Sequence, residues 1–157
     1  YILERGFSDR PLTLVGFSLG GRAIAYAMEY LAAHDGYGLV DNIYLFGSAI
    51  STTNPRIYYL TEMSAGHVVN VYSRKDVILN YWYRAMQGFS TAIGLTALDR
   101  EGIIDYDATD EVGGHFQYPK KLGEILYTIR RELGEAPIVT ANAPQMNVNA
   151  LAARMVS

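Results

Sequence analysis

Short apolar runs alternate along this chain with longer stretches in which apolar residues recur at helical spacing. The short runs predict strands over residues 12–17, 42–46, 67–72 and 102–106. The helical spacing predicts helices over residues 19–33, 57–63, 79–86 and 118–133, and residues 88–98 fit either another helix or a loop. Because strands and helices alternate, we expect an α/β fold: a mainly parallel sheet of about four strands flanked by helices.

The pattern weakens toward both ends of the chain. Tyr1 to Gly6 resemble the end of a helix that is already under way, and no initiator Met precedes them. Beyond Gly134, two Ala-Pro pairs interrupt regular structure, and only residues 149–156 suggest a short helix. We therefore expect a partial domain over residues 1–133, a C-terminal tail over residues 134–157, and a chain that is the later part of a longer protein.

Composition narrows the class of protein. Of the 157 residues, 50% are hydrophobic and 18% are charged, which is typical of a globular domain. The formal net charge of −3 argues against a nucleic-acid partner bound through bulk charge. The chain has no cysteine, so disulfides and cysteine metal sites are excluded, and we expect neither a cofactor nor a metal. This absence fits the cytosol and an oxidising compartment equally. The N-terminus lacks signal-peptide features.

The main candidate for a catalytic motif is Gly16-Phe17-Ser18-Leu19-Gly20, which lies where the first predicted strand passes into the first predicted helix. A G-x-S-x-G motif in this context is typical of a nucleophile elbow, in which a strained turn exposes the serine hydroxyl. Gly16 and Gly20 are expected to avoid collisions in the turn, and Gly21 to let the helix pack close to the strand. The Leu19 N–H is expected to donate to an oxyanion.

Other glycine-rich turns explain this stretch less well. A dinucleotide-binding fingerprint needs G-x-G-x-x-G, and a P-loop needs Lys-Ser or Lys-Thr after its glycines, so a nucleotide-dependent enzyme is disfavoured. An ordinary strand-to-helix turn in another α/β protein is the simpler alternative. Ser48 follows the second predicted strand but lacks a glycine two residues before it and another two residues after it, which favours a lining role over a nucleophilic one.

A serine nucleophile needs an imidazole base and a carboxylate that orients the base. Ser18, Asp76 and His115 occur in the chain order Ser, Asp, His of α/β-hydrolases, each after a predicted strand. Asp76 also fits the N-cap of the helix that follows it, and both roles are compatible. His115 fits an unpartnered loop histidine as the alternative.

Other candidates for the same roles are weaker. Asp107 and Asp110 compete with Asp76, but they lie too close to His115 in sequence to occupy the preceding strand end. His34 fits the last turn of a helix, where it meets the negative end of the dipole. His67 opens a strand and is expected to be structural.

Several segments resemble a eukaryotic family of transmembrane and coiled-coil-domain lipase-like proteins within the α/β-hydrolase superfamily. The segments that carry the resemblance are residues 12–20, 38–47, 69–73 with Asp76, Tyr83-Arg84, and 112–115 with Tyr118. The resemblance implies the C-terminal half of an α/β-hydrolase fold and a serine ester hydrolase with Ser18, Asp76 and His115 as its triad. It also implies association with membranes through segments upstream of this chain, although the sequence does not determine a localisation.

A complete fold of that type has strands before the elbow, together with a loop that supplies a second oxyanion donor. These residues do not include them. The isolated segment is therefore expected to be weakly active or inactive, and the first strand to pair with the missing N-terminal half or with a second copy. The expected substrate is a small-molecule ester, in particular a lipid. The alternative is a catalytically incomplete module that binds lipid or protein.

Overall fold

The computed structural model describes residues 12–87 and 90–135. The strands are β1 (Leu12–Phe17), β2 (Val40–Phe46), β3 (Val68–Tyr72) and β4 (Ile103–Asp107). The helices are α1 (Leu19–Ala33), α2 (Ile57–Glu62), α3 (Val77–Gln87) and α4 (Tyr118–Glu132), with 3-10 turns η2 (Ile93–Leu95) and η3 (His115–Gln117). The chain divides into two compact units, residues 1–126 and 127–157, and α4 continues from the first into the second.

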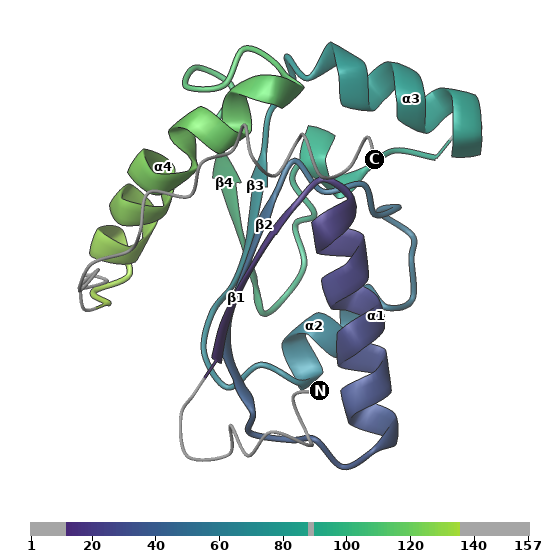
Figure 1. The fold of residues 1–157 in the computed structure, drawn as a ribbon, viewed down its shortest axis with the longest axis vertical. Coiled ribbons are helices and arrows are strands. Elements are labelled where there is room, and N and C mark those ends of the chain that lie inside the picture. Colours follow the sequence, from purple (N-terminus) through teal and green to yellow (C-terminus); the bar gives the residue numbers. More distant parts are fainter. Residues whose placement is uncertain (1–11, 88–89, 136–157) are drawn as a thin grey trace, which may run out of the picture. The chain divides into compact units, whose positions relative to one another are not determined.

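The four strands form one parallel sheet in the order β1-β2-β3-β4 (Figure 1). Each crossover moves one strand further in the same direction. Since such crossovers are right-handed, α1 and α2 lie on the same face of the sheet and contact each other. The predicted α/β class and parallel sheet are confirmed. β1 and β4 are the outer strands of the described sheet, and Val15 of β1 is 42% exposed.

The main hydrophobic core lies between this face of the sheet and α1, α2 and η2. Its largest buried side chains come from all of these elements: Met28, Ile43, Leu45, Ile50, Ile57, Leu60, Met63 and Ile93. Burial of this apolar area is the dominant favourable contribution to folding. It fixes the carboxyl end of β1 against the N-terminal end of α1.

The first residue of α4 packs on the carboxyl ends of the strands. The Tyr118 ring contacts the rings of Phe17 and Phe46, with centroids 5.8 and 6.4 Å apart. Gly47 has φ 49°, and a Cβ there would lie 2.6 Å from Cε2 of Tyr118, so both the backbone and the space require glycine. Burial raises the pKa of Tyr118. This packing positions η3, which immediately precedes α4.

The described part of the second unit consists of the end of α4 and the turn that follows it. Gly134 has φ 70°, and its N–H donates to Arg131 O while the Glu135 N–H donates to Arg130 O, at 3.2 and 2.8 Å. This is the Schellman arrangement that ends many helices. The predicted end of regular structure near Gly134 therefore has a local cause.

Most predicted boundaries agree with the structure. β1 and α1 match, whereas β2 begins earlier, at Val40, and α3 earlier, at Val77. The segment that fitted a helix or a loop contains η2, and residues 88–89 within it lie outside the described part. The expectations for residues 1–11 and 136–157 also lie outside it. No helix of residues 12–87 and 90–135 has the length and apolar character needed to cross a membrane.

Candidate active site

Ser18 occupies a strained turn between β1 and α1. Its φ and ψ are 53° and −117°, a conformation that residues other than glycine rarely adopt. Two hydrogen bonds hold its backbone against the end of β2: Ser18 N–H donates to Phe46 O at 3.0 Å, and Ala49 N–H donates to Ser18 O at 3.1 Å. Strain of this kind costs about 1–3 kcal/mol and persists only where the surroundings impose it.

The glycines around Ser18 are required to different degrees. A Cβ at Gly16 would lie 2.7 Å from Cδ1 of Ile24 and 2.8 Å from the backbone of Gly21. A Cβ at Gly21 would collide with the Ser48 side chain, because it would lie 2.7 Å from Cβ of Ser48 and closer still to its Oγ. A Cβ at Gly20 would meet no atom within 4 Å. The expected steric need for Gly20 is therefore wrong, because its α-hydrogens face open space.

Two adjacent substitutions test this difference. Gly21→Ala is expected to destabilise the fold by about 1–3 kcal/mol, because Ser48 and the end of β2 would have to shift. Gly20→Ala is the matched control and should stabilise it by about 0.5–1 kcal/mol, because alanine favours the helix. Urea unfolding monitored by circular dichroism measures both. Equal effects of the two substitutions would contradict the assigned packing.

The structure brings Ser18, His115 and Asp76 together. Nε2 of His115 lies 2.8 Å from Oγ of Ser18, and Nδ1 of His115 lies 2.6 Å from Oδ2 of Asp76. Asp76 is fully buried and His115 is 8% exposed. The pairing is satisfied when Nδ1–H donates to Asp76 and Nε2 accepts from the Ser18 hydroxyl. These contacts span 39 and 97 residues of sequence, so only tertiary packing makes them.

Asp76 also caps the following helix. Its Oδ1 accepts a hydrogen bond from the Leu79 N–H at 2.9 Å, at the N-terminal end of α3. One carboxylate oxygen thus binds the imidazole and the other binds the helix backbone. Asp76 therefore makes the N-cap contact that the sequence allowed, and it also contacts the imidazole of His115. The cap also explains why α3 begins at Val77.

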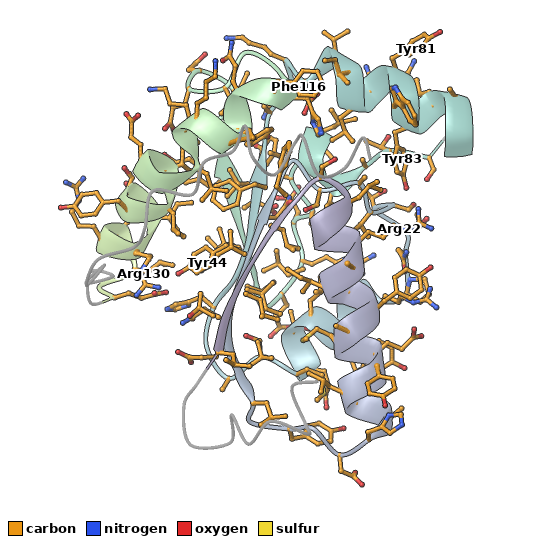
Figure 2. The ribbon with its side chains drawn as sticks, in the orientation of Figure 1. Arg22, Tyr44, Tyr81, Tyr83, Phe116 and Arg130 are labelled. Carbon is orange, nitrogen blue, oxygen red and sulfur yellow. The ribbon has the colours of Figure 1, made fainter. Side chains whose placement is uncertain are left out.

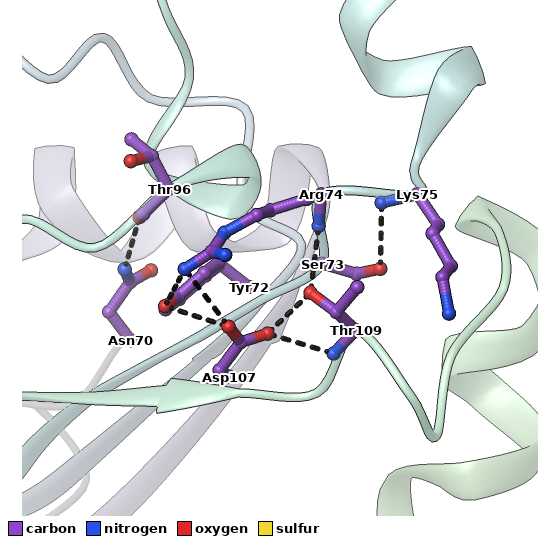
Figure 3. A network of polar contacts seen from close by, with 8 residues as sticks. All are labelled: Asn70, Tyr72, Ser73, Arg74, Lys75, Thr96, Asp107 and Thr109. Atoms are coloured by element: carbon purple, nitrogen blue, oxygen red, sulfur yellow. Dashed lines mark hydrogen bonds and ion pairs between the residues drawn. The ribbon is translucent and has the colours of Figure 1, made fainter.

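A polar network joins the loop that carries Asp76 to the segment that precedes His115 (Figure 3). The buried hydroxyl of Ser73 donates to Val112 O at 2.7 Å, and Arg74 N–H donates to Thr109 Oγ1 at 3.1 Å. Asp107 accepts from the Thr109 hydroxyl and pairs with Arg74. These bonds join the loop that carries Asp76 to the segment that precedes His115.

The rival residues have other partners. Asp107 is the last residue of β4, whereas Asp76 follows the end of the preceding strand, β3. Asp107 accepts hydrogen bonds from Thr109 and from Tyr72 Oη. Burial alone would raise the pKa of Asp107, but the bonds from Thr109 and Tyr72 and the nearby Arg74 lower it below its usual range. Asp110 pairs with Lys75 at 3.1 Å.

The other candidate serine and histidines also have structural explanations. His34 follows α1, and its Nδ1 lies 2.8 Å from Tyr30 O. His67 precedes β3, and its N–H donates to Oδ1 of Asn42 at 2.8 Å. Ser48 is fully buried against Gly21, and within the described part of the chain its Oγ has no hydrogen-bond partner. It is a packing residue and does not line the cleft beside Ser18.

A cleft of about 370 Å³ opens directly onto Ser18 and His115. The remaining lining residues come from α1, α3 and the loops next to them: Leu19, Arg22, Ala49, Ile78, Leu79, Trp82, Tyr83 and Phe116. Its volume lies near the lower end of the range for small-molecule sites. Because most of the lining is apolar, the cleft suits an extended hydrocarbon group better than a polar ligand.

Two of the apolar side chains that line this cleft are also largely exposed. Trp82 of α3 is 64% exposed, and Phe116 of η3 is 72% exposed. Figure 2 shows Tyr81 and Tyr83 on α3 and Phe116 beyond the ends of the strands. Leu19, the first residue of α1, is 67% exposed; its N–H has no partner within the helix because it lies in the first turn. No group of three or more acidic or histidine side chains in the described residues is arranged to hold a metal.

Comparisons with known proteins identify relatives of this chain. A family model described as "Protein of unknown function (DUF726)" matches residues 1–132. The chain is 35% identical over 130 residues to a protein of Saccharomyces cerevisiae named "Probable lipase MIL1". It is 39% identical over 127 residues to the "Transmembrane and coiled-coil domain-containing protein STS1" of Oryza sativa subsp. japonica.

These alignments cover most of this chain but little of each relative. They span 82% and 80% of the chain, and only 12% of the yeast protein and 19% of the rice protein. An "Uncharacterized membrane protein" of Caenorhabditis elegans is 28% identical over 85% of the chain and 22% of its own length. No solved structure matches the chain.

Proposed function

Because the chain belongs to the DUF726 family, whose description leaves its function open, we propose an activity from the site itself: a lipase-like serine ester hydrolase of the α/β-hydrolase superfamily. The observation that carries the proposal is the continuous hydrogen-bonded chain from Ser18 Oγ through His115 to Asp76, built on a strained strand-to-helix turn. The same three roles in the same chain order define α/β-hydrolase sites.

The proposed reaction follows from this geometry. Ser18 Oγ attacks the ester carbonyl carbon while its proton moves to Nε2 of His115. The tetrahedral intermediate then collapses, the carbon–oxygen bond to the alcohol breaks, and His115 returns the proton to the leaving alkoxide. Water then attacks the acyl-enzyme with His115 as base, which releases the acid and restores Ser18. Asp76 fixes the imidazole tautomer and stabilises the imidazolium.

Leu19 is the proposed oxyanion donor. As the first residue of α1, its amide lies next to the nucleophile at the positive end of the helix dipole. One donor of this kind typically contributes about 10²–10³ in rate. A second donor would come from other parts of the protein, since the chain spans less than a quarter of the length of these relatives.

The apolar cleft supports a substrate with a hydrocarbon chain. Ile78, Trp82 and Phe116 line it and leave few groups that could hydrogen-bond a polar acyl group. The name of the yeast relative, a probable lipase, agrees with this chemistry, and the names of the rice and nematode relatives suggest association with membranes. We therefore assign a lipid ester as the proposed substrate class.

A fluorophosphonate probe tests the nucleophile. Applied to the full-length protein, it is expected to attach covalently to Ser18, because only a hydroxyl activated by an imidazole attacks the phosphorus rapidly. Mass spectrometry of the digested protein identifies the labelled residue. His115→Gln should slow the labelling by at least about 10²-fold, since it removes the base.

Ser48→Ala is the matched control. It removes a second serine hydroxyl next to the turn, and this hydroxyl lies outside the cleft. Labelling of Ser18 should continue at the original rate in this variant. A folded protein that is not labelled at Ser18 would refute the hydrolase and favour the alternative, a hydrolase-like module that binds lipid or protein.

A further inference from the structure

Among the described residues that line the cleft, Arg22 is the one with a permanently charged side chain. The other lining residues are apolar apart from Ser18, His115 and the hydroxyl of Tyr83. Figure 2 shows Arg22 on α1, on the side of this helix where Tyr83 of α3 lies. A guanidinium in such a lining requires an explanation, because an apolar residue would serve a purely hydrocarbon ligand better.

In the part of the chain that the structure describes, no acidic side chain forms an ion pair with Arg22. None of the ion pairs within residues 12–87 and 90–135 involves its guanidinium, whose assigned neighbour is the Tyr26 ring, with Cζ 6.0 Å from the centroid. Arg56 also lies over Tyr26, yet its Nε pairs with Glu29 at 2.7 Å. Likewise Arg74 and Lys75, near the other side of the site, pair with carboxylates.

The position of Arg22 relative to Ser18 restricts the anion it can meet. Ser18 is the N-cap of α1 and Arg22 follows it by four residues, which corresponds to a rise of about 6 Å along the helix axis. If the ester carbonyl of a ligand lies at Ser18, the part of the ligand that reaches Arg22 is therefore only a few bonds away from that carbonyl. In a glycerophospholipid the phosphate stands at this separation from the acyl ester. A guanidinium binds phosphate through paired, charge-assisted hydrogen bonds.

We infer that Arg22 makes this a site for acyl esters that carry a phosphate group close to the scissile carbonyl. The inference rests on the proposed function for the ester, and it adds the head group. The acyl chain lies along Ile78, Trp82 and Phe116, the carbonyl lies at Ser18, and the phosphate lies against Arg22. Neutral glycerides fill the same cleft but leave the guanidinium without its anion.

Binding to the full-length Ser18→Ala protein tests the inference without turnover. The probes are a short-chain monoacylglycerol phosphate, the neutral monoacylglycerol with the same chain, and glycerol phosphate without a chain, each below its micelle concentration. Arg22→Gln should weaken binding of the acylglycerol phosphate on the order of 10- to 100-fold and leave the neutral lipid within about twofold. Arg22→Lys should retain part of the affinity. Glycerol phosphate should bind more weakly than the acylated probe.

Arg84→Gln is the matched control, because it removes an exposed positive charge from α3 that does not line the cleft. Equal weakening by Arg22→Gln and Arg84→Gln would indicate general electrostatic attraction and overturn the inference. Equal affinity for the phosphorylated and neutral lipids would also overturn it. If binding depends on Arg22 but the full-length protein with Ser18 intact hydrolyses neither lipid, the proposed hydrolase activity alone would be refuted. Hydrolysis of both lipids at similar kcat/KM, unchanged by Arg22→Gln, would refute the phosphate preference alone.

Discussion

Replacement of Ser18 by glycine or by alanine is expected to lower ester hydrolysis by about 10⁴–10⁶-fold, while the glycine variant remains the more stable of the two. Both substitutions remove the proposed nucleophile. They differ in the conformational cost of the backbone, because a φ of 53° is unfavourable for alanine but readily adopted by glycine. The glycine variant should exceed the alanine variant by about 1–2 kcal/mol in the free energy of unfolding.

Hydrolysis of a chromogenic short-chain ester and urea unfolding measure these two effects in the full-length protein. The paired design separates the hydroxyl from the strain, since both variants lack the hydroxyl. Equal stability of the two variants would contradict the strained turn. Hydrolysis that persists in both would contradict the nucleophile, whatever the stabilities are.

Asp76→Asn is expected to lower kcat by about 10⁴-fold with little loss of stability. An asparagine retains an oxygen for the Leu79 N–H, and asparagine is as good an N-cap as aspartate. It loses the charge that holds His115 in the tautomer with Nδ1–H and that stabilises the imidazolium. Kinetics of ester hydrolysis and thermal unfolding of the same preparation give both quantities.

Asp76→Ala distinguishes the two roles of this carboxylate. It should reduce kcat to a similar extent, and its lost cap should lower stability by about 1 kcal/mol more than Asp76→Asn does. If Asp76→Asn kept most of the activity, Asp76 would act only as a cap. Asp107→Asn is the matched control, because Asp107 lies at the neighbouring strand end and bonds Thr109 and Tyr72 instead of His115. It should leave kcat within about tenfold.

Local patterns were sufficient to predict the regular elements. The apolar run over residues 12–17 and the helical periodicity after it matched β1 and α1, because each depends on neighbours within a turn or a strand. The glycines of the Ser18 turn indicated a strained backbone, which the structure has. The prediction was wrong at Gly20, where an added Cβ would meet no atom within 4 Å, whereas one at Gly21 would collide with Ser48 of another segment.

The sequence by itself determined the order of strands and helices, the sharp turn at Ser18, and the residue types that could form a triad, because these follow from local periodicity and turn chemistry. Only the tertiary structure decided that His115 lies between Ser18 and Asp76 while Asp107 bonds elsewhere, and that Arg22 is the cation of an apolar cleft. The physical reason is that such contacts join residues far apart in sequence. Their distances are set by how the sheet, α1 and α3 pack together, and no local pattern encodes that packing.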